Sequence, residues 1–352
     1  MNIGLVIYGS LDYTSGGYFY DRRLVAYLRA QGDEVRIIAL PWRDYFKHLT
    51  DNLSFRLPPG LDLVIQDELN HPSLLRANRY IHPYPLISLV HHLRSSEQRP
   101  AWQNAFYRLI ERRYLRSVDG LILNSKTTRD AVQKLAGDSK AQIVAYPPTD
   151  RFGSSLSANE VRLRAATSLP LRILFLGNLI PRKGLHTLLA ALSLHPSAFH
   201  LDIVGAPEAD PAYTRALQDQ AVASGLESRV RFHGPLDDNS LTKKFRSSQV
   251  LVVPSSYEGF GIVYLEGMGF GLPAIGTTAG AACEIITDGQ TGYLVPPEDP
   301  AVLAARLLSL ARDRDLLTRM SLNALARYRR QPAWDQTAYS IRQFLLKFTH
   351  QA

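Results

Sequence analysis

Two glutamates and several glycines in one run of the chain carry the clearest chemical signal. The run 257–273 follows an apolar stretch at 251–254, typical of a buried strand, and it opens a helix. Its glycines let the backbone approach a ligand, and the free N–H groups of the helix start, at 261–263, can bind a diphosphate. Glu258 precedes this helix and Glu266 lies more than one turn inside it. We therefore expect the two carboxylates to bind different hydroxyl groups of one ligand.

A second strand-turn-helix run, 175–184, places two cations beside a glycine turn. Arg182 and Lys183 stand where a helix begins, although positive charge opposes the helix dipole there. A bound phosphate would offset this repulsion, because cations and backbone N–H groups bind phosphate together. The run therefore predicts a phosphate site, with a water-exposed basic helix start as the alternative.

The first half of the chain offers weaker signals. Gly16 and Gly17 follow the first expected strand, where paired glycines permit a tight loop next to phosphate or serve only the turn. His91 and His92 end an expected strand at 86–90. A histidine in this position can hydrogen-bond sugar hydroxyls, but histidines that end strands are also common in cores and at surfaces.

The motifs together resemble the family-four retaining glycosyltransferases, whose Glu-x7-Glu motif matches Glu258 and Glu266. The resemblance implies the GT-B fold, in which two doubly wound Rossmann-like domains face each other across a cleft. It implies that Glu258 contacts the donor sugar, that Glu266 contacts the nucleotide ribose, and that His91 lies near the transferring sugar. The glycine pair at 16–17 would face the donor from the other domain.

The resemblance also completes the set of candidate site residues. Lys183 matches the family's phosphate-binding lysine, but Asn178 stands where arginine is frequent, and whether Arg182 substitutes for that arginine stays open. The predicted catalytic residues are His91, Arg182, Lys183 and Glu258. The predicted donor-binding residues are Gly16, Gly17, Gly177, Asn178, Phe260, Gly261, Ile262, Val263 and Glu266. We expect no cofactor, because the nucleotide sugar is a substrate, and no metal site, because the one Asp-x-Asp triplet, 313–315, falls in a turn between late helices.

The length of 352 residues fits two α/β domains. Short apolar runs alternate with amphipathic ones, which is typical of parallel sheets covered on both faces, so the predicted fold class is α/β. The pattern breaks in a stretch of prolines, serines and small residues at 147–170. We therefore expect an N-terminal Rossmann-like acceptor domain at 1–165 and a Rossmann-like donor domain at 166–332. The resemblance implies that a last helix, within 333–352, crosses back to the first domain.

The net charge of +8 lies mainly in the first half, where residues 1–165 hold 22 Lys and Arg against 16 Asp and Glu. Much of the excess belongs to 94–129, around an expected helix at 102–117. Such a stripe attracts phosphates or anionic lipid headgroups, although a solvated helix face is the simpler interpretation. No nucleic-acid motif accompanies the charge, which disfavours a nucleic-acid partner.

The single cysteine, Cys283, cannot form an internal disulfide, and we expect it to serve packing. Apolar runs fall far short of the roughly 20 residues that span a bilayer. We expect a cytoplasmic protein, with peripheral contact on the inner membrane face left open.

The predicted function is a retaining, metal-independent glycosyltransferase of the hexosyltransferase class. It would use a UDP- or GDP-sugar and an acceptor hydroxyl on a lipid-linked, polysaccharide or small soluble acceptor; retention follows from the resemblance alone. A nicotinamide dehydrogenase is disfavoured, because the first strand-helix turn lacks the Gly-x-Gly-x-x-Gly pattern. A non-catalytic nucleotide-sugar or carbohydrate-binding protein and a nucleotide-sugar epimerase on the same fold remain as alternatives.

Overall fold

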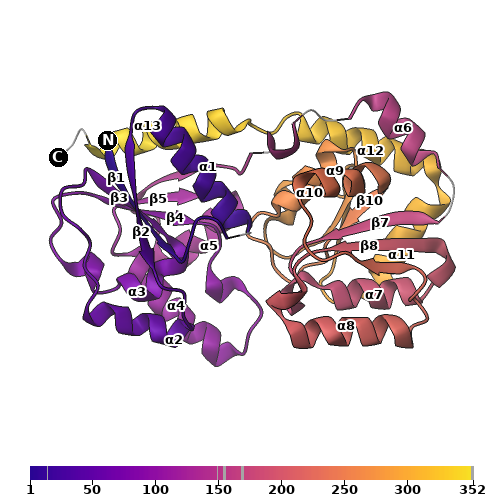
Figure 1. Cartoon of the computed structure of the whole chain (residues 1–352), viewed down its shortest axis with the longest axis horizontal. Helices are drawn as coiled ribbons and strands as arrows, with labels where there is room; N and C mark the ends of the chain where they lie inside the picture. The colour runs from indigo at the N-terminus through magenta and orange to yellow at the C-terminus, as the bar shows by residue number, and fades with distance from the viewer. Residues whose placement is uncertain (14, 149, 154–155, 168–169, 350–352) are drawn as a thin grey trace. The chain divides into compact units, whose positions relative to one another are not determined.

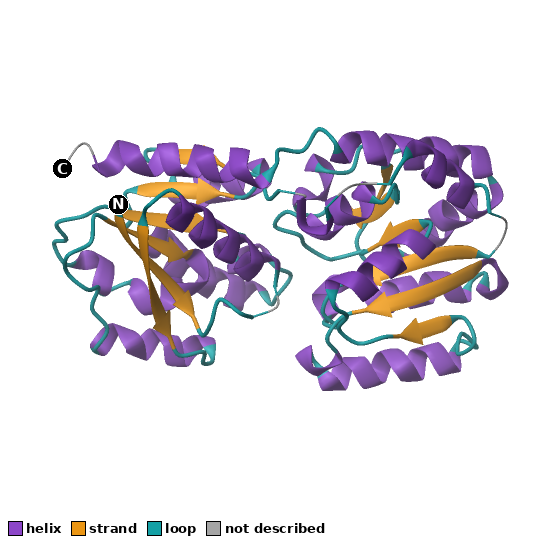
Figure 2. Ribbon diagram, turned by 45° about the horizontal axis from the view of Figure 1, so that its top comes forward, coloured by secondary structure: helices purple, strands orange, loops and turns teal. Residues whose placement is uncertain are grey.

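The computed structural model describes residues 1–349 except 14, 149, 154, 155, 168 and 169, and it divides into two compact units. The first unit comprises Met1–Pro148 and Pro332–Ala352, and the second comprises Thr149–Gln331. Each unit contains a six-stranded sheet of parallel strands, with helices on the faces of the sheet (Figure 1, Figure 2). The predicted α/β class is confirmed.

The sheet of the first unit has the strand order β2-β1-β3-β4-β5-β6. Its strands are β1 (Asn2–Tyr8), β2 (Glu34–Leu40), β3 (Leu63–Asp67), β4 (Leu86–Val90), β5 (Gly120–Leu123) and β6 (Ala141–Val144). Its helices are α1 (Gly16–Ala30), α2 (Tyr45–His48), α3 (His71–Leu74), α4 (Ala101–Leu115), α5 (Lys126–Ala136) and α13 (Trp334–Thr349).

Alternate residues of β1 show how the sheet of the first unit is buried on both faces. Ile3, Leu5 and Ile7 pack in one core with side chains of α1 and α13. Val6 and Tyr8 point to the opposite face and pack in a second core with side chains of α4 and α5. This period of two is what a strand between two helical layers requires.

The helix α13 follows the second unit in sequence and packs on the first, beside α1 (Figure 1). The indole Nε1 of Trp334 donates to the Arg23 carbonyl oxygen at 3.0 Å. The guanidinium of Arg342 donates to both carboxylate oxygens of Asp33, at 2.7 and 3.2 Å. Polar contacts and buried apolar side chains thus both attach α13 to the first unit.

The sheet of the second unit has the order β12-β11-β10-β7-β8-β9. Its strands are β7 (Leu171–Leu176), β8 (Phe199–Val204), β9 (Val230–Phe232), β10 (Val250–Val252), β11 (Ala274–Thr277) and β12 (Gly292–Val295). Its helices are α6 (Ala158–Ala165), α7 (Leu185–Ser193), α8 (Pro211–Ala223), α9 (Asp238–Ser247), α10 (Ile262–Gly269), α11 (Pro300–Arg312) and α12 (Arg314–Tyr328). Figure 1 shows α7 and α8 on one face of this sheet and α9, α10 and α12 on the other.

The units divide after Pro148, whereas the sequence analysis placed the division after residue 165. The difference is the helix α6, which was missed within the proline- and serine-rich stretch and which begins with a capping box. It packs on α12, and the buried guanidinium of Arg164 donates to the Gly271 carbonyl oxygen at 2.8 Å. These contacts make α6 part of the second unit.

The structure corrects two smaller expectations, on Cys283 and on the triplet 313–315. Cys283 was expected to serve packing, and this is wrong: its side chain is exposed, while Ala281 and Ala282 occupy the buried positions of the same turn. The triplet 313–315, expected in a turn between two helices, lies there only in part: Asp313 is the N-cap of α12 and accepts a bond from the Leu316 N–H at 2.8 Å, while Arg314 and Asp315 belong to α12 itself.

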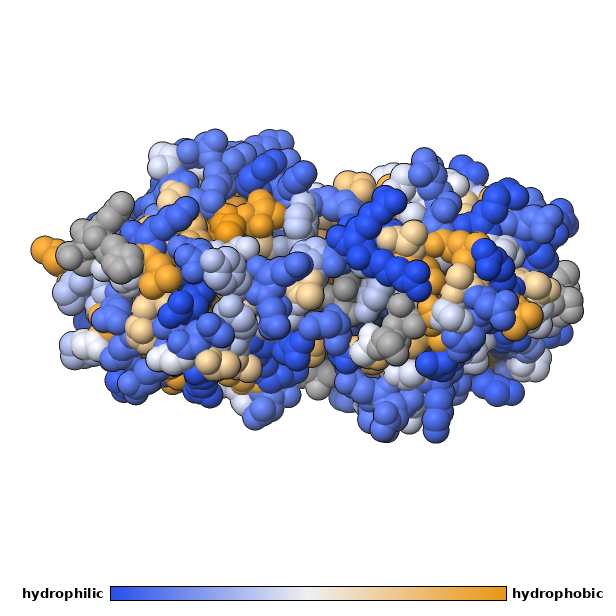
Figure 3. All heavy atoms as spheres, turned by 90° about the horizontal axis from the view of Figure 1, so that it is seen from above, coloured by the Kyte–Doolittle hydropathy of each residue, from blue (hydrophilic) through white to orange (hydrophobic). Residues whose placement is uncertain are grey.

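One face of the molecule shows how hydrophilic and hydrophobic residues are distributed over it. Most residues on the face drawn in Figure 3 are hydrophilic, and hydrophobic residues appear there in small groups. Among the described helices, none combines the length and the apolar character needed to cross a membrane.

Candidate functional site

An ion pair in the second unit joins the loops that follow two neighbouring strands, β7 and β10. Lys183 Nζ lies 2.5 Å from Glu258 Oε1, and the Ser255 hydroxyl donates to the same oxygen at 2.7 Å. The Glu258 side chain is only 9% exposed. Burial by itself raises the pKa of Glu258, but the charges of Lys183 and Arg182 and the two hydrogen bonds bring it below its ordinary value. Glu258 is therefore a carboxylate at neutral pH.

Arg182 binds the same loop from one residue before Lys183. Its guanidinium donates to the Tyr257 carbonyl oxygen at 2.8 Å, and its own carbonyl accepts from the Ser256 N–H at 2.8 Å. The two loops come so close behind the cations that a Cβ at Gly184 would lie 2.1 Å from the Pro254 carbonyl oxygen. Glycine at this position lets the two loops meet, which places Arg182 and Lys183 beside Glu258.

The phosphate-loop residues Gly177 and Asn178 lie at the end of β7. An added Cβ on Gly177 would lie 3.5 Å from the alkyl chain of Lys183, so the glycine and the lysine are neighbours, as the sequence analysis required. Asn178 is exposed. Gly177 and Lys183 thus form one end of the site, with Asn178 at its water-exposed margin.

The start of α10 lies directly after Glu258 and depends on a glycine. Gly261 has a φ of +89°, and a Cβ there would lie 2.6 Å from the ring of Tyr264. That ring is buried, and its hydroxyl donates to the Val253 carbonyl oxygen at 2.7 Å. The first N–H groups of an α-helix have no partner within the helix. Gly261, Ile262 and Val263 are partly accessible, so these donors can bind an anion, while Phe260 is buried beside them.

Glu266 has a different partner, which the sequence analysis missed. Arg151 donates to Glu266 Oε1 at 3.1 Å and to Asp238 Oδ1 at 2.7 Å. Glu266 is 3% exposed, and its burial raises its pKa despite the nearby guanidinium. Arg151 lies in the stretch of prolines, serines and small residues at 147–170, and no pattern of residues there predicted this contact. Within the second unit, Glu258 therefore pairs with Lys183 and Glu266 pairs with Arg151.

In the first unit, His91 follows β4 and lies against α1. Its Nε2 is 3.1 Å from Asp21 Oδ1, and a Cβ on Gly17 would lie 3.2 Å from the ring. Gly17 and His91, which the sequence analysis placed in one site, are therefore adjacent. Gly16 and Gly17 are the first two residues of α1. Burial lowers the pKa of His91, but Asp21 and Asp67 outweigh it and raise the pKa to about 9. His91 is thus an imidazolium at neutral pH and a hydrogen-bond donor.

Two groups of largely buried side chains near the carboxyl ends of β3 and β4 have the composition of metal ligands. They are Asp21, Asp67 and His91, and Glu68, His71 and Glu111, with ligand atoms within 4.8 Å of one another in each group. Protein partners already occupy both nitrogens of His71: Tyr45 Oη lies 2.8 Å from Nε2, and the Glu68 carbonyl lies 2.9 Å from Nδ1. His71 is therefore held by protein atoms, whereas Asp21 Oδ2, Glu68 Oε1 and Glu111 Oε2 are buried without a hydrogen-bond partner among the described residues.

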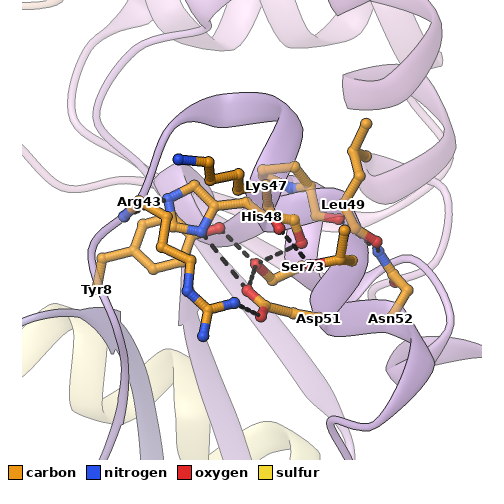
Figure 4. Close-up of polar contacts among 10 residues, drawn as sticks. Tyr8, Arg43, Lys47, His48, Leu49, Asp51, Asn52 and Ser73 are labelled. Carbon is orange, nitrogen blue, oxygen red and sulfur yellow. Dashed lines mark hydrogen bonds and ion pairs between the residues drawn. The ribbon is translucent and has the colours of Figure 1, made fainter.

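A polar cluster that the sequence did not predict lies beside the end of β1 (Figure 4). The hydroxyl groups of Tyr8 and Ser73 are 2.6 Å apart, and Ser73 donates to Asp51 at 2.7 Å. Asp51 also accepts from Arg43 at 2.9 Å, and the rings of Tyr8 and His48 stack with centroids 3.8 Å apart. The cluster fixes the segment between β2 and α2 against the sheet.

Comparison with known proteins shows what the chain, and its second unit above all, is similar to. Residues 165–327 match the family model described as glycosyl transferases group 1. A D-inositol 3-phosphate glycosyltransferase of Streptomyces avermitilis is 31% identical over 242 residues, covering 65% of this chain and 52% of the relative. A glycogen synthase of Mycobacterium tuberculosis is 29% identical over 283 residues, covering 78% of this chain and 66% of the relative. The chain spans about half to two thirds of the length of these relatives.

Solved structures resemble the chain over its full length. Sucrose-phosphate synthase from Thermosynechococcus elongatus has a TM-score of 0.85 at 20% identity, covering 100% of both chains. Anabaena HepE in complex with UDP-glucose has a TM-score of 0.79 at 19% identity, covering 99% of this chain and 100% of the other. The GT-B fold expected from the sequence is confirmed by these likenesses, and the resemblance to glycosyltransferases by the family match.

Proposed function

We propose that the protein moves a sugar from a nucleotide-diphosphate donor to an acceptor hydroxyl, because residues 165–327 match the family model of glycosyl transferases group 1. The observation that carries the proposal is the arrangement of Lys183, Arg182 and Glu258 beside the start of α10. It combines two cations, a carboxylate and free backbone N–H groups in one small region. These are the groups that a diphosphate linked to a sugar requires.

The diphosphate would bind the first N–H groups of α10 and the two cations. Lys183 is engaged with Glu258, but an ammonium group has three donors and can serve a phosphate oxygen at the same time. As the bond to the anomeric carbon breaks, its electron pair moves to the phosphate oxygen, and the cations and N–H groups stabilise the added negative charge. This charge neutralisation comes from the protein itself, without a metal ion.

Each carboxylate would bind a different part of the donor. Glu258, an anion at neutral pH, would accept hydrogen bonds from hydroxyl groups of the sugar. Glu266 would accept from the nucleotide ribose, sharing its carboxylate with Arg151. His91, as an imidazolium, would donate to the sugar rather than act as a base.

Transfer would retain the configuration of the anomeric carbon. The acceptor oxygen would form its bond on the face from which the diphosphate departs, and the departing phosphate would take the acceptor proton. The acceptor would be a hydroxyl of a lipid-linked or polysaccharide precursor. We would test uridine-diphosphate donors first and guanosine-diphosphate donors second, because the structure of Anabaena HepE contains UDP-glucose.

The test is calorimetric titration of UDP, GDP and ADP into the wild type, Lys183→Met and a control, Lys243→Met. Lys243 is exposed on α9 of the same unit. One nucleotide should bind the wild type and the control with the same affinity. It should bind Lys183→Met about ten- to hundredfold more weakly, because this variant lacks one charge-assisted hydrogen bond to the phosphates. Folded protein that binds no nucleotide would overturn the proposal. Binding without sugar transfer to any acceptor in a glycan and lipid panel would favour a non-catalytic binding protein.

A further inference from the structure

We propose that the water-facing side of α4 binds anionic lipid bilayers. This surface, called here the α4 outer face, consists of the exposed residues of the helix that lie opposite its buried side. They are Trp102, Ala105, Arg108, Leu109, Arg112 and Arg113. The inference goes beyond sugar transfer, and it rests on helix geometry, exposure and charge.

Helical spacing gathers apolar side chains at the centre of the α4 outer face. Trp102, Ala105 and Leu109 recur at intervals of three and four residues and lie on one side of the helix. Trp102 is 68% exposed and Leu109 is 61% exposed. The opposite side carries Tyr107 and Tyr114, which are buried in the first unit. The helix thus has a second apolar stripe that the fold does not cover.

An exposed aromatic residue of a neighbouring helix extends this surface. Phe46 of α2 is 57% exposed, and its ring centroid lies 5.8 Å from that of Phe106 on α4. A large aromatic or aliphatic side chain exposed alone is ordinary on a protein surface. Here three of them, Trp102, Leu109 and Phe46, lie on two helices that meet through the rings of Phe46 and Phe106, so they can serve one partner together.

The exposed charges of α4 around the apolar stripe have one sign. Arg108 and Arg112 flank it on one side and Arg113 on the other, as the helical period of 3.6 residues requires. The one acid of α4, Glu111, is buried and accepts from the Ser95 N–H at 3.1 Å. Within the described part of the chain, none of these three arginines forms an ion pair with a carboxylate. Their charge is available to an external anion.

The combination selects a bilayer rather than another polyanion. A nucleic acid or an acidic polymer would use the arginines but would leave Trp102 and Leu109 in water. An anionic membrane satisfies both, because the apolar side chains enter the boundary between headgroups and acyl chains while the arginines bind lipid phosphates. Tryptophan is also enriched at that boundary, where one end of its ring is apolar and the other is polar.

The experiment measures sedimentation of the full chain with vesicles of phosphatidylcholine alone and of phosphatidylcholine mixed with phosphatidylglycerol. One variant replaces Arg108, Arg112 and Arg113 with Gln. Its matched control replaces Arg215, Arg312 and Arg319 with Gln, three exposed arginines of the second unit. A second pair compares Trp102→Ala/Leu109→Ala with Leu194→Ala/Val222→Ala, where the control residues are 54% and 58% exposed.

The wild type should bind the mixed vesicles and bind phosphatidylcholine far more weakly. Each arginine near the surface contributes about fivefold, so the α4 arginine variant should bind roughly a hundredfold more weakly and the control little changed. At high salt, which screens the arginines, the wild type should keep part of its vesicle binding, and the Trp102→Ala/Leu109→Ala variant should lose this part. Brominated acyl chains should quench fluorescence in the wild type, and the quenching should disappear in Trp102→Phe.

Three results would overturn the proposal. The first is absence of binding to the mixed vesicles. The second is an equal loss in the two arginine variants, which would mean attraction by net charge alone. The third is vesicle binding that is unchanged in Trp102→Ala/Leu109→Ala, together with binding of a soluble polyanion at the same affinity. Vesicle binding needs no nucleotide and no sugar transfer, so its outcome is independent of the proposed enzymatic activity.

Discussion

Replacing Lys183 with methionine should destabilise the second unit in a way that depends on pH. The substitution keeps most of the alkyl chain and removes the charge that lies 2.5 Å from Glu258. Breaking a buried ion pair by removing one partner costs about 3–5 kcal/mol. Ser255 still donates to the carboxylate and Arg182 still lies nearby, so we expect a loss near the lower end, about 3 kcal/mol at pH 8.

The sign of the pH dependence follows from the two environments of Glu258. In the wild type its pKa is lowered, so its contribution is present above its ordinary pKa and is lost as the pH falls through the lowered value. Without Lys183, burial dominates and raises this pKa, so the variant loses stability as the pH rises through the raised value. The deficit of the variant should therefore be largest at pH 8 and smaller at pH 5.

The assay must report the second unit separately. All three tryptophans, at 42, 102 and 334, belong to the first unit, so their fluorescence during urea unfolding serves as an internal control. Hydrogen exchange of peptides from 171–295 reports the second unit. Lys243→Met is the matched control and should change stability by less than about 0.5 kcal/mol. Equal deficits at pH 5 and pH 8 would refute the role assigned to the ion pair.

Three further perturbations test the local geometry. Gly261→Ala must place a Cβ 2.6 Å from a buried ring at a φ of +89°, so it should lower the free energy of unfolding of the second unit by at least about 2 kcal/mol. The control Gly289→Ala, where φ is +71° and no atom lies near the added Cβ, should lower it by about 1 kcal/mol. Hydrogen exchange measures both losses, and equal losses would contradict the role of the clash. Because the pKa of His91 is raised to about 9, the stabilisation that its charge gives the first unit is complete below its ordinary pKa and is lost as the pH rises through about 9. The free energy of unfolding of the first unit should therefore fall over this pH range in urea titrations followed by tryptophan fluorescence. His91→Gln should remove this fall. Arg342→Ala leaves the buried carboxylate of Asp33 without two bonds and should cost the first unit about 2 kcal/mol in the same assay. An unchanged midpoint would mean that the ion pair adds nothing to the other contacts of α13.

Sequence reasoning recovered the architecture because hydrophobic periodicity determines it. Strands such as β4 and β10 are short, fully buried and bounded by turn residues, so their positions were predictable within one or two residues. The helix α6 was missed because its capping box lies among prolines and serines that are typical of linkers. Its place in the second unit depends on the packing of α6 on α12, which no local pattern reveals.

The candidate site divides in the same way. Lys183 and Glu258 were predictable because each follows a buried strand beside glycines. The contact of Arg151 with Glu266 joins residues far apart in sequence and has no local signal. The same holds for Asp21, which looks like an ordinary residue of α1 until the fold brings it to His91. Sequence identified the groups able to do chemistry, and tertiary structure supplied the partners that set their protonation.

The attachment of α13 to the first unit has a consequence for folding during synthesis. The whole second unit lies between β6 and α13 in the chain, so the ribosome completes the second unit before the helix that covers one face of the first sheet. Until then the apolar residues of α1 and β1 that pack against α13 remain partly uncovered. The nascent first unit therefore exposes apolar side chains until α13 is made, and we expect a chain truncated before residue 334 to aggregate through its first unit.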